Sequence, residues 1–173
     1  MSRFILPLLA VCLFFLEPVF SLFSPIDISG MEFTLVPRFV IIYLIFLAVY
    51  YNQKRAILLG LVLGLLYDMY HIDIIGVYTF LYPLVCYLGA LLIRQVHRHI
   101  VTVMFLSVVL IVLLELLSYF FASLIALTSI SMEEFIIRRL VPTMIANAIF
   151  IGMFGWLFKK LMTGRGLQKQ AGS

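Results

Sequence analysis

Three carboxylates interrupt long apolar stretches of the sequence, at Glu17, Asp68 and Glu115. An ionised carboxylate that faces lipid is costly, so each one must face other helices, pair with a cation or stay protonated. Arg38 and Arg139 stand at the edges of apolar stretches and are the candidate cations. Such an ionic cluster can fix how helices pack, or it can form a polar site that binds a small ligand or receives a partner's helix. The residue types alone leave both interpretations open.

The stretches that carry these groups are those of a membrane protein. The composition is 65% apolar and 12% charged, which excludes an ordinary soluble domain and a disordered chain. A helix that crosses the hydrocarbon layer needs about 20 mostly apolar residues. The sequence therefore predicts an all-α integral membrane protein, a single domain over residues 1–173 with six transmembrane helices. The predicted spans cover residues 4–23, 33–51, 56–75, 77–93, 100–127 and 140–158.

The basic residues predict the orientation of these spans. If the spans alternate in direction, one side carries most of the Lys and Arg residues and no carboxylate, and the other side carries three arginines and all the loop carboxylates. By the positive-inside rule the first side is cytoplasmic, so both termini are predicted to be cytoplasmic. The cytoplasmic cations are Arg3, Lys54, Arg55, Arg94, Arg98, Lys159, Lys160, Arg165 and Lys169. The basic tail is also expected to favour anionic membrane lipid.

In this orientation the three carboxylates share one depth. Counted from the cytoplasmic ends of their spans at 1.5 Å per residue, Glu17, Asp68 and Glu115 lie about 20, 18 and 22 Å into the bilayer. Arg38 opens the second span from the outside and Arg139 precedes the sixth, so both can reach the same level. We therefore expect an intramembrane polar layer of these five residues in the outer half of the membrane.

Small residues in the third span form the sharpest local pattern. Gly60, Gly64 and Asp68 recur every four residues and so lie along one stripe of a helix. Small residues at this spacing let another backbone come close, which predicts a helix contact within the chain or with a partner. Gly76 follows in the next turn, where glycine permits backbone angles that other residues resist. A second group of small residues, in the sixth span beside Asn147, comprises Ala148, Gly152 and Gly155.

Catalytic and metal-binding patterns are missing from the sequence. It contains no His-Glu-x-x-His helix, no Gly-x-Ser-x-Gly turn and no phosphate-binding glycine loop. His71 with Asp68 and Asp73 makes a poor zinc site, because three ligands on a loop lack a fourth. We therefore predict a protein that is not an enzyme, with no catalytic residue, metal or cofactor and with no nucleic-acid partner.

The stretch from Leu59 to Asp68, followed by Gly76 and by an aromatic-rich fourth span through Tyr87, resembles the bacterial rod shape-determining protein MreD family. The chain length, the number of spans, Pro37-Arg38 at the second span and the short basic tail are similar as well. Gly60, Gly64, Asp68 and Gly76 match the family's motif, whereas Glu17 and Glu115 rest on the depth argument alone.

This resemblance implies a non-enzymatic, multi-pass subunit of the cell-elongation complex in the bacterial cell membrane. Such a subunit maintains rod shape by scaffolding side-wall peptidoglycan synthesis through transmembrane helix contacts. The implied partners are MreC and, in the same complex, RodA, a class B penicillin-binding protein and MreB. The alternative is a substrate-binding membrane subunit of an energy-coupling-factor type vitamin transporter, which has a similar size and number of spans. Those subunits resemble each other in an Ala-x-x-x-Ala contact on the first helix, where this chain has Ala10 among bulky residues.

Overall fold

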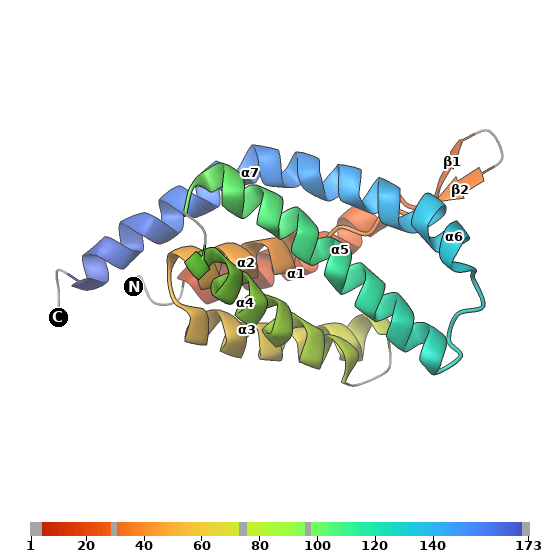
Figure 1. Ribbon diagram of the computed structural model, residues 1–173, viewed down its shortest axis with the longest axis horizontal. Helices are drawn as coiled ribbons and strands as arrows, with labels where there is room; N and C mark the ends of the chain where they lie inside the picture. The colour runs from red at the N-terminus through yellow and green to blue at the C-terminus, as the bar shows by residue number, and fades with distance from the viewer. Residues whose placement is uncertain (1–4, 29–30, 73–75, 96–97, 171–173) are drawn as a thin grey trace.

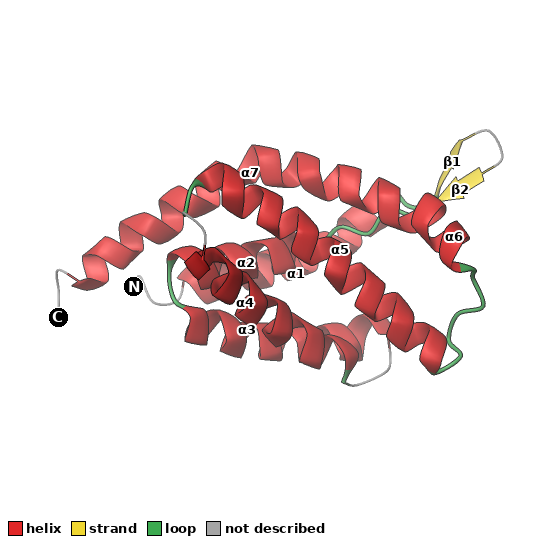
Figure 2. Ribbon diagram, in the orientation of Figure 1, coloured by secondary structure: helices red, strands yellow, loops and turns green. Residues whose placement is uncertain are grey.

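The computed structural model describes residues 5–28, 31–72, 76–95 and 98–170 as a helical bundle with one small hairpin (Figures 1 and 2). In chain order the elements are α1 (Ile5–Ser21), β1 (Ile26–Ile28), β2 (Met31–Phe33), α2 (Phe39–Tyr50), α3 (Gln53–Tyr67), the π-helical turn η1 (Asp68–Ile72), α4 (Val77–Gln95), α5 (Ile100–Leu124), α6 (Met132–Phe135), the π-helical turn η2 (Ile136–Leu140) and α7 (Val141–Gln170). Strands β1 and β2 pair antiparallel, with Asp27 opposite Glu32.

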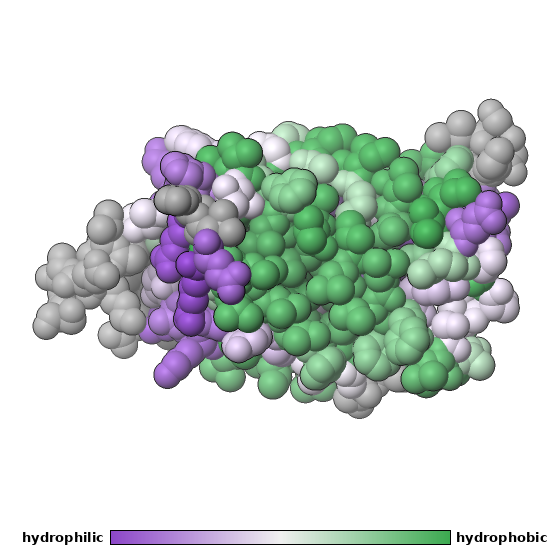
Figure 3. Space-filling model, in the orientation of Figure 1, coloured by the Kyte–Doolittle hydropathy of each residue, from purple (hydrophilic) through white to green (hydrophobic). Residues whose placement is uncertain are grey.

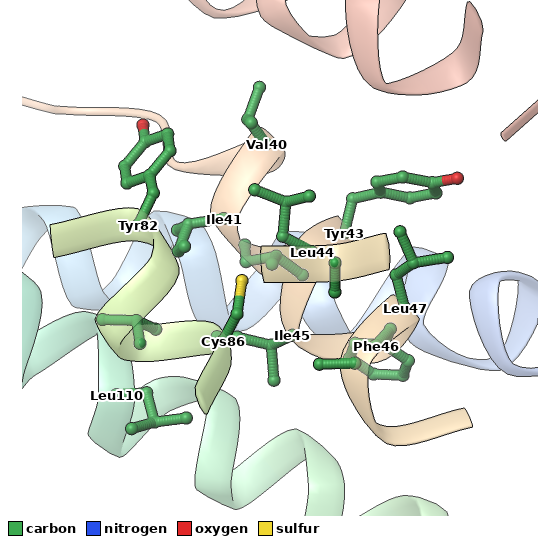
Figure 4. Close-up of a cluster of buried hydrophobic side chains, with 14 of the residues drawn as sticks. Val40, Ile41, Tyr43, Leu44, Ile45, Phe46, Leu47, Tyr82, Cys86 and Leu110 are labelled. Atoms are coloured by element: carbon green, nitrogen blue, oxygen red, sulfur yellow. The ribbon is translucent and has the colours of Figure 1, made fainter. Parts of the chain in front are cut away.

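Helix α2 forms the centre of the bundle. Its residues from Phe39 to Val49 are all buried, as expected for a helix that is apolar on every side. It packs against α1, α3, α4, α5 and α7. Figure 4 shows its side chains beside Tyr82 and Cys86 of α4, with Leu110 of α5 nearby. The other helices therefore surround one buried helix.

The face of the bundle seen in Figure 3 is apolar in the middle and polar at both ends. Figure 3 shows a broad hydrophobic band between two hydrophilic ends. Within the described residues, three helices are long and apolar enough to cross a membrane, and two apolar helices are shorter. The three are Val77–Gln95, Ile100–Leu124 and Met132–Gly164, and the shorter two are Ile5–Ser21 and Phe39–Tyr50. These features indicate a membrane protein, and the count of six spans stays a prediction.

The two ends of the bundle differ in charge. Helix α1 begins and α7 ends at one end, which we call the terminal end, and the β1–β2 hairpin lies at the other, the hairpin end (Figure 1). Lys54 and Arg55 lie in the first turn of α3 and Arg94 lies in the last turn of α4, and both of these helix ends are at the terminal end. The carboxylates of α6, Glu133 and Glu134, lie at the hairpin end. The predicted cytoplasmic side corresponds to the terminal end.

Several element boundaries differ from the predicted spans. Helix α2 begins at Phe39 and not at residue 33, because Met31–Phe33 forms a strand, Pro37 disfavours a helical conformation of the residue before it, and Arg38 has non-helical backbone angles. Helix α7 runs beyond residue 158 to Gln170, past the apolar stretch. Phe4 of the first predicted span and residues 73–75 of the third lie outside the described residues, as does the predicted cytoplasmic cation Arg3.

Candidate functional site

Arg38, the residue immediately before α2, is completely buried and connects α2 to α4 and α5. Its Nε donates a hydrogen bond to Oε1 of Glu115 on α5, at 2.5 Å, and its Nη2 donates to the Tyr78 hydroxyl on α4, at 2.7 Å. Its Cζ also lies 4.9 Å from the ring centre of Tyr78 and 5.4 Å from that of Tyr67. A buried guanidinium requires such ionic, hydrogen-bonding and aromatic partners.

Glu115 contacts a second cation as well. Arg139, in η2, places its Nε 3.5 Å from Oε2 of Glu115, and its side chain is 40% exposed. One buried carboxylate therefore lies between two guanidinium groups, and this ion cluster carries a net positive charge. The neighbouring Arg138 pairs with Glu134 of α6 at 2.9 Å, at the surface.

The chain entering α2 is held by side chains of α7. The Arg38 N–H donates to Oδ1 of Asn147 at 2.8 Å, and Nδ2 of Asn147 donates to the Val36 carbonyl at 3.0 Å. The Val36 N–H donates to the Thr143 hydroxyl at 3.1 Å. Because the backbone on both sides of Pro37 is outside regular structure, these buried groups need side-chain partners. Asn147 and Thr143 provide them and so fix the position of Arg38.

Asp68 acts as a helix cap for α4. Its carboxylate accepts hydrogen bonds from the N–H groups of Gly76, Tyr78 and Thr79 at 2.8–2.9 Å, and from the Thr79 hydroxyl at 2.7 Å. The first N–H groups of a helix lack partners inside the helix, and the helix dipole favours a negative charge there. Gly76 has a φ of +126°, which favours glycine, and its turn brings these N–H groups to Asp68.

Glu17 has the same role at α2. It is buried on α1, and its Oε1 accepts a hydrogen bond from the N–H of Val40, the second residue of α2, at 2.8 Å. Arg38 stands at the N-cap position of α2 and makes no capping bond with its side chain. The carboxylate of α1 thus supplies the acceptor that the preceding residue does not.

The glycine stripe of α3 lies against α4. A Cβ on Gly64 would be 2.7 Å from the carbonyl carbon of Tyr78 and 3.0 Å from Cα of Thr79, closer than side chains normally approach backbone. A Cβ on Gly60 would be 3.4 Å from the carbonyl carbon of Tyr82, an ordinary contact. The close approach that the stripe permits is therefore made inside the chain, and α4 covers both glycines.

Comparison with known proteins identifies the family. The family model described as rod shape-determining protein MreD matches residues 2–164. The chain is 31% identical over 147 residues to the rod shape-determining protein MreD of Bacillus subtilis strain 168, covering 85% of this chain and 86% of that protein. This chain belongs to the MreD family. It is also 35% identical over 130 residues to the cell shape-determining protein MreD of Streptococcus pneumoniae R6, covering 73% of this chain and 77% of that one. No solved structure matches it.

In this MreD chain the residues of the expected polar layer have separate tasks. Arg38, Arg139 and Glu115 form one ion cluster, whereas Asp68 and Glu17 cap helices. Tyr78 joins two of these groups, because its N–H donates to Asp68 and its hydroxyl accepts from Arg38. Nothing in the sequence distinguishes Tyr78 for this role, since it is one aromatic residue among many. Asn147, in contrast, stands out in the sequence, because it is a polar amide inside an apolar stretch.

The described residues of this MreD chain contain no group of three His, Cys, Asp or Glu side chains that could hold a metal ion. Its two cysteines are free thiols: Cys86 is buried against α2 and Cys12 is exposed. The polar groups described above cap helices, Glu17 of α1 on α2 and Asp68 of η1 on α4, and form ion pairs at Glu115 of α5.

Proposed function

We propose that this chain is a non-enzymatic subunit of the bacterial cell-elongation complex, which maintains rod shape by scaffolding side-wall peptidoglycan synthesis. Membership of the MreD family carries this proposal, because the relatives are named as shape-determining proteins. The use of Asp68, Glu17 and Glu115 in capping and pairing supports a scaffold, since these contacts hold helices in place.

The proposed setting is the cell membrane, with six spans and both termini in the cytoplasm. The start of α1 and the end of α7 at one end of the bundle support an even number of crossings (Figure 1). The basic residues of that end support its placement in the cytoplasm. The apolar band of Figure 3 supports contact with lipid between the two ends.

The proposed partners are MreC, together with RodA, a class B penicillin-binding protein and MreB, and they are contacted through outward helix faces. Because α4 covers the glycine stripe of α3, a partner helix has to pack against another face of the bundle. Helix α7 offers such a face. Gly152 is exposed there and a Cβ added to it would meet nothing within 4 Å, and Ala148, one turn earlier, is exposed too. Gly155 faces inward, where a Cβ would meet Met104 and Phe46. Small residues on an outward face allow a partner helix to pack closely.

The variant Gly152→Leu tests this contact. The added side chain has open space in the isolated protein, so its thermal stability in detergent should be unchanged, whereas recovery of MreC and rescue of rod shape in a depleted strain should fall. Gly164→Leu is the matched control, because a Cβ there also meets nothing within 4 Å and the residue lies near the end of α7. Equal partner recovery and equal shape rescue by both variants would contradict a contact at this face.

A second candidate function is the binding subunit of a vitamin transporter. The observation that favours it is a cavity of about 500 Å³ at the hairpin end, lined by Arg38 and Arg139 among others. The family match weighs against it. The two functions predict different co-purifying proteins, namely wall-synthesis proteins or an ATPase with a second membrane component.

A further inference from the structure

A cavity opens into the bundle at the hairpin end, between α4, α5, α6 and the loop that joins α5 to α6. Its volume of about 500 Å³ lies within the range of small-ligand sites. The polar lining includes Arg38, Tyr78, Ser118, Tyr119, Arg138 and Arg139. Neither helix capping nor helix packing explains a cavity at this position.

The inner wall of the cavity offers hydrogen-bond donors to an anion. Arg38 is fully buried, and within the described residues its Nη1 has no hydrogen-bond partner. A buried charged donor that lacks an acceptor is costly, so a ligand acceptor there would be stabilising. Arg139 is half exposed and shares the single carboxylate of Glu115 with Arg38. The inner wall therefore carries an uncompensated positive charge.

The carboxylates and hydroxyls of the lining do not offset this charge. Glu134 is already paired with Arg138 at 2.9 Å, and Glu32 is exposed on β2. The Tyr119 hydroxyl donates to the Ile130 carbonyl at 2.8 Å, so its proton is already engaged. The donors that remain on the inner wall are thus the guanidinium groups and the Tyr78 hydroxyl, which accepts from Arg38 and keeps its own proton to donate. Such donors suit a phosphate or a carboxylate.

The outer part of the lining is apolar and exposed. Ile125, Leu127 and Ile130, all in the loop between α5 and α6, line the cavity and are 47%, 56% and 50% exposed. Exposed apolar side chains next to a charged interior suit an amphiphile, with its head inside and its chains outside. A free ion would use the guanidinium groups alone.

We propose that this cavity binds a phosphate-bearing anionic group, with a lipid headgroup as its source and its acyl chains on the apolar rim. The phosphate oxygens accept hydrogen bonds from Arg38 Nη1 and from Arg139. This inference goes beyond the scaffold function and does not depend on it, since the binding can be measured on the isolated protein.

Calorimetric titration of the purified full-length protein in a neutral detergent tests the proposal. The probes are dioctanoyl phosphatidic acid, inorganic phosphate and dioctanoylglycerol, which has the same chains without the phosphate. We expect saturable binding of the phosphatidic acid and none of the dioctanoylglycerol. Saturable binding of inorganic phosphate that depends on the same residues would support the anion site with a free ion as its source. Equal binding of the phosphatidic acid and the dioctanoylglycerol would overturn the proposal.

Two variants test the position of the site by different changes. Arg139→Gln removes one half-exposed guanidinium and should weaken binding about tenfold or more, as expected for one charge-assisted hydrogen bond. Ala122→Trp, on the cavity wall in α5, should abolish saturable binding by filling the space while leaving every charge in place. Lys160→Gln, an exposed cation at the terminal end, is the control for net charge and should bind as the wild type does. Wild-type affinity in both cavity variants, or equal weakening in the control, would overturn the proposal.

Discussion

Gly64→Ala is expected to destabilise the isolated protein, whereas Gly60→Ala, one turn earlier on α3, is expected to be tolerated. The new Cβ at Gly64 would lie 2.7 Å from the carbonyl carbon of Tyr78 and 3.0 Å from Cα of Thr79. Both are backbone atoms of α4 and cannot rotate away, so α3 and α4 must separate by several tenths of an ångström. At Gly60 the nearest atom would be 3.4 Å away, which needs no movement.

The comparison of these two variants isolates the steric effect. Each alanine gains about 1 kcal/mol of helix propensity over glycine, and this gain cancels between them. Overpacking a well-packed interface costs about 1–3 kcal/mol, and this cost applies to Gly64→Ala alone. At about 2–4 °C per kcal/mol for a chain of this size, the midpoint of Gly64→Ala should be about 2–12 °C lower than that of Gly60→Ala.

The assay is thermal unfolding of both purified variants in the same detergent, with no partner protein present. Its outcome separates an internal helix contact from a partner contact, because a stripe used only by a partner would leave the isolated protein unaffected. Equal midpoints, or a lower midpoint for Gly60→Ala, would refute the close packing of α3 on α4.

Three further comparisons of variants test the polar contacts. Asp68→Asn should lower thermal stability and shape rescue more than Asp27→Asn on the exposed hairpin, because it loses charge-assisted hydrogen bonds of about 1.5–3 kcal/mol each; equal tolerance of both changes would count against the capping role. Glu115→Gln should cost about 3–5 kcal/mol, because it leaves the buried charge of Arg38 unpaired. Arg38→Gln should cost less, because Arg139 still faces Glu115. The double variant should cost less than the sum of the two in a double-mutant cycle, and additive costs would contradict the ion pair. Glu17→Gln keeps an acceptor for α2 and should unfold at a higher temperature than Glu17→Leu, and the reverse order would contradict the cap.

The sequence predicted which residues are buried and polar better than it predicted their partners. Glu17, Asp68, Glu115 and Arg38 stand out because each interrupts or borders an apolar stretch, and all four are buried. Arg38 contacts Glu115, an ion pair between oppositely charged groups at similar predicted depth. Hydrogen bonds to the end of a neighbouring helix depend on how the helices are placed in space. The spacing of residues along the sequence therefore could not predict the caps made by Asp68 and Glu17.

The region between α1 and α2 was the least predictable part of the fold. The apolar residues around Phe33 read as the start of a span, yet they pair in a short hairpin, and the chain then crosses to Phe39 with α7 side chains as partners. Short strands and irregular segments lack the periodicity that marks helices. Likewise, the glycine spacing of α3 predicted a close helix contact, and only the packing of α4 identified the neighbour.

The most direct test of the scaffold proposal is purification of the tagged full-length protein from its native membrane in a mild detergent, with the co-purifying proteins identified by mass spectrometry. The account predicts recovery of a bitopic MreC protein together with RodA and a class B penicillin-binding protein. Recovery of ATPase subunits and a second membrane component in their place would contradict it and would assign the chain to a transporter.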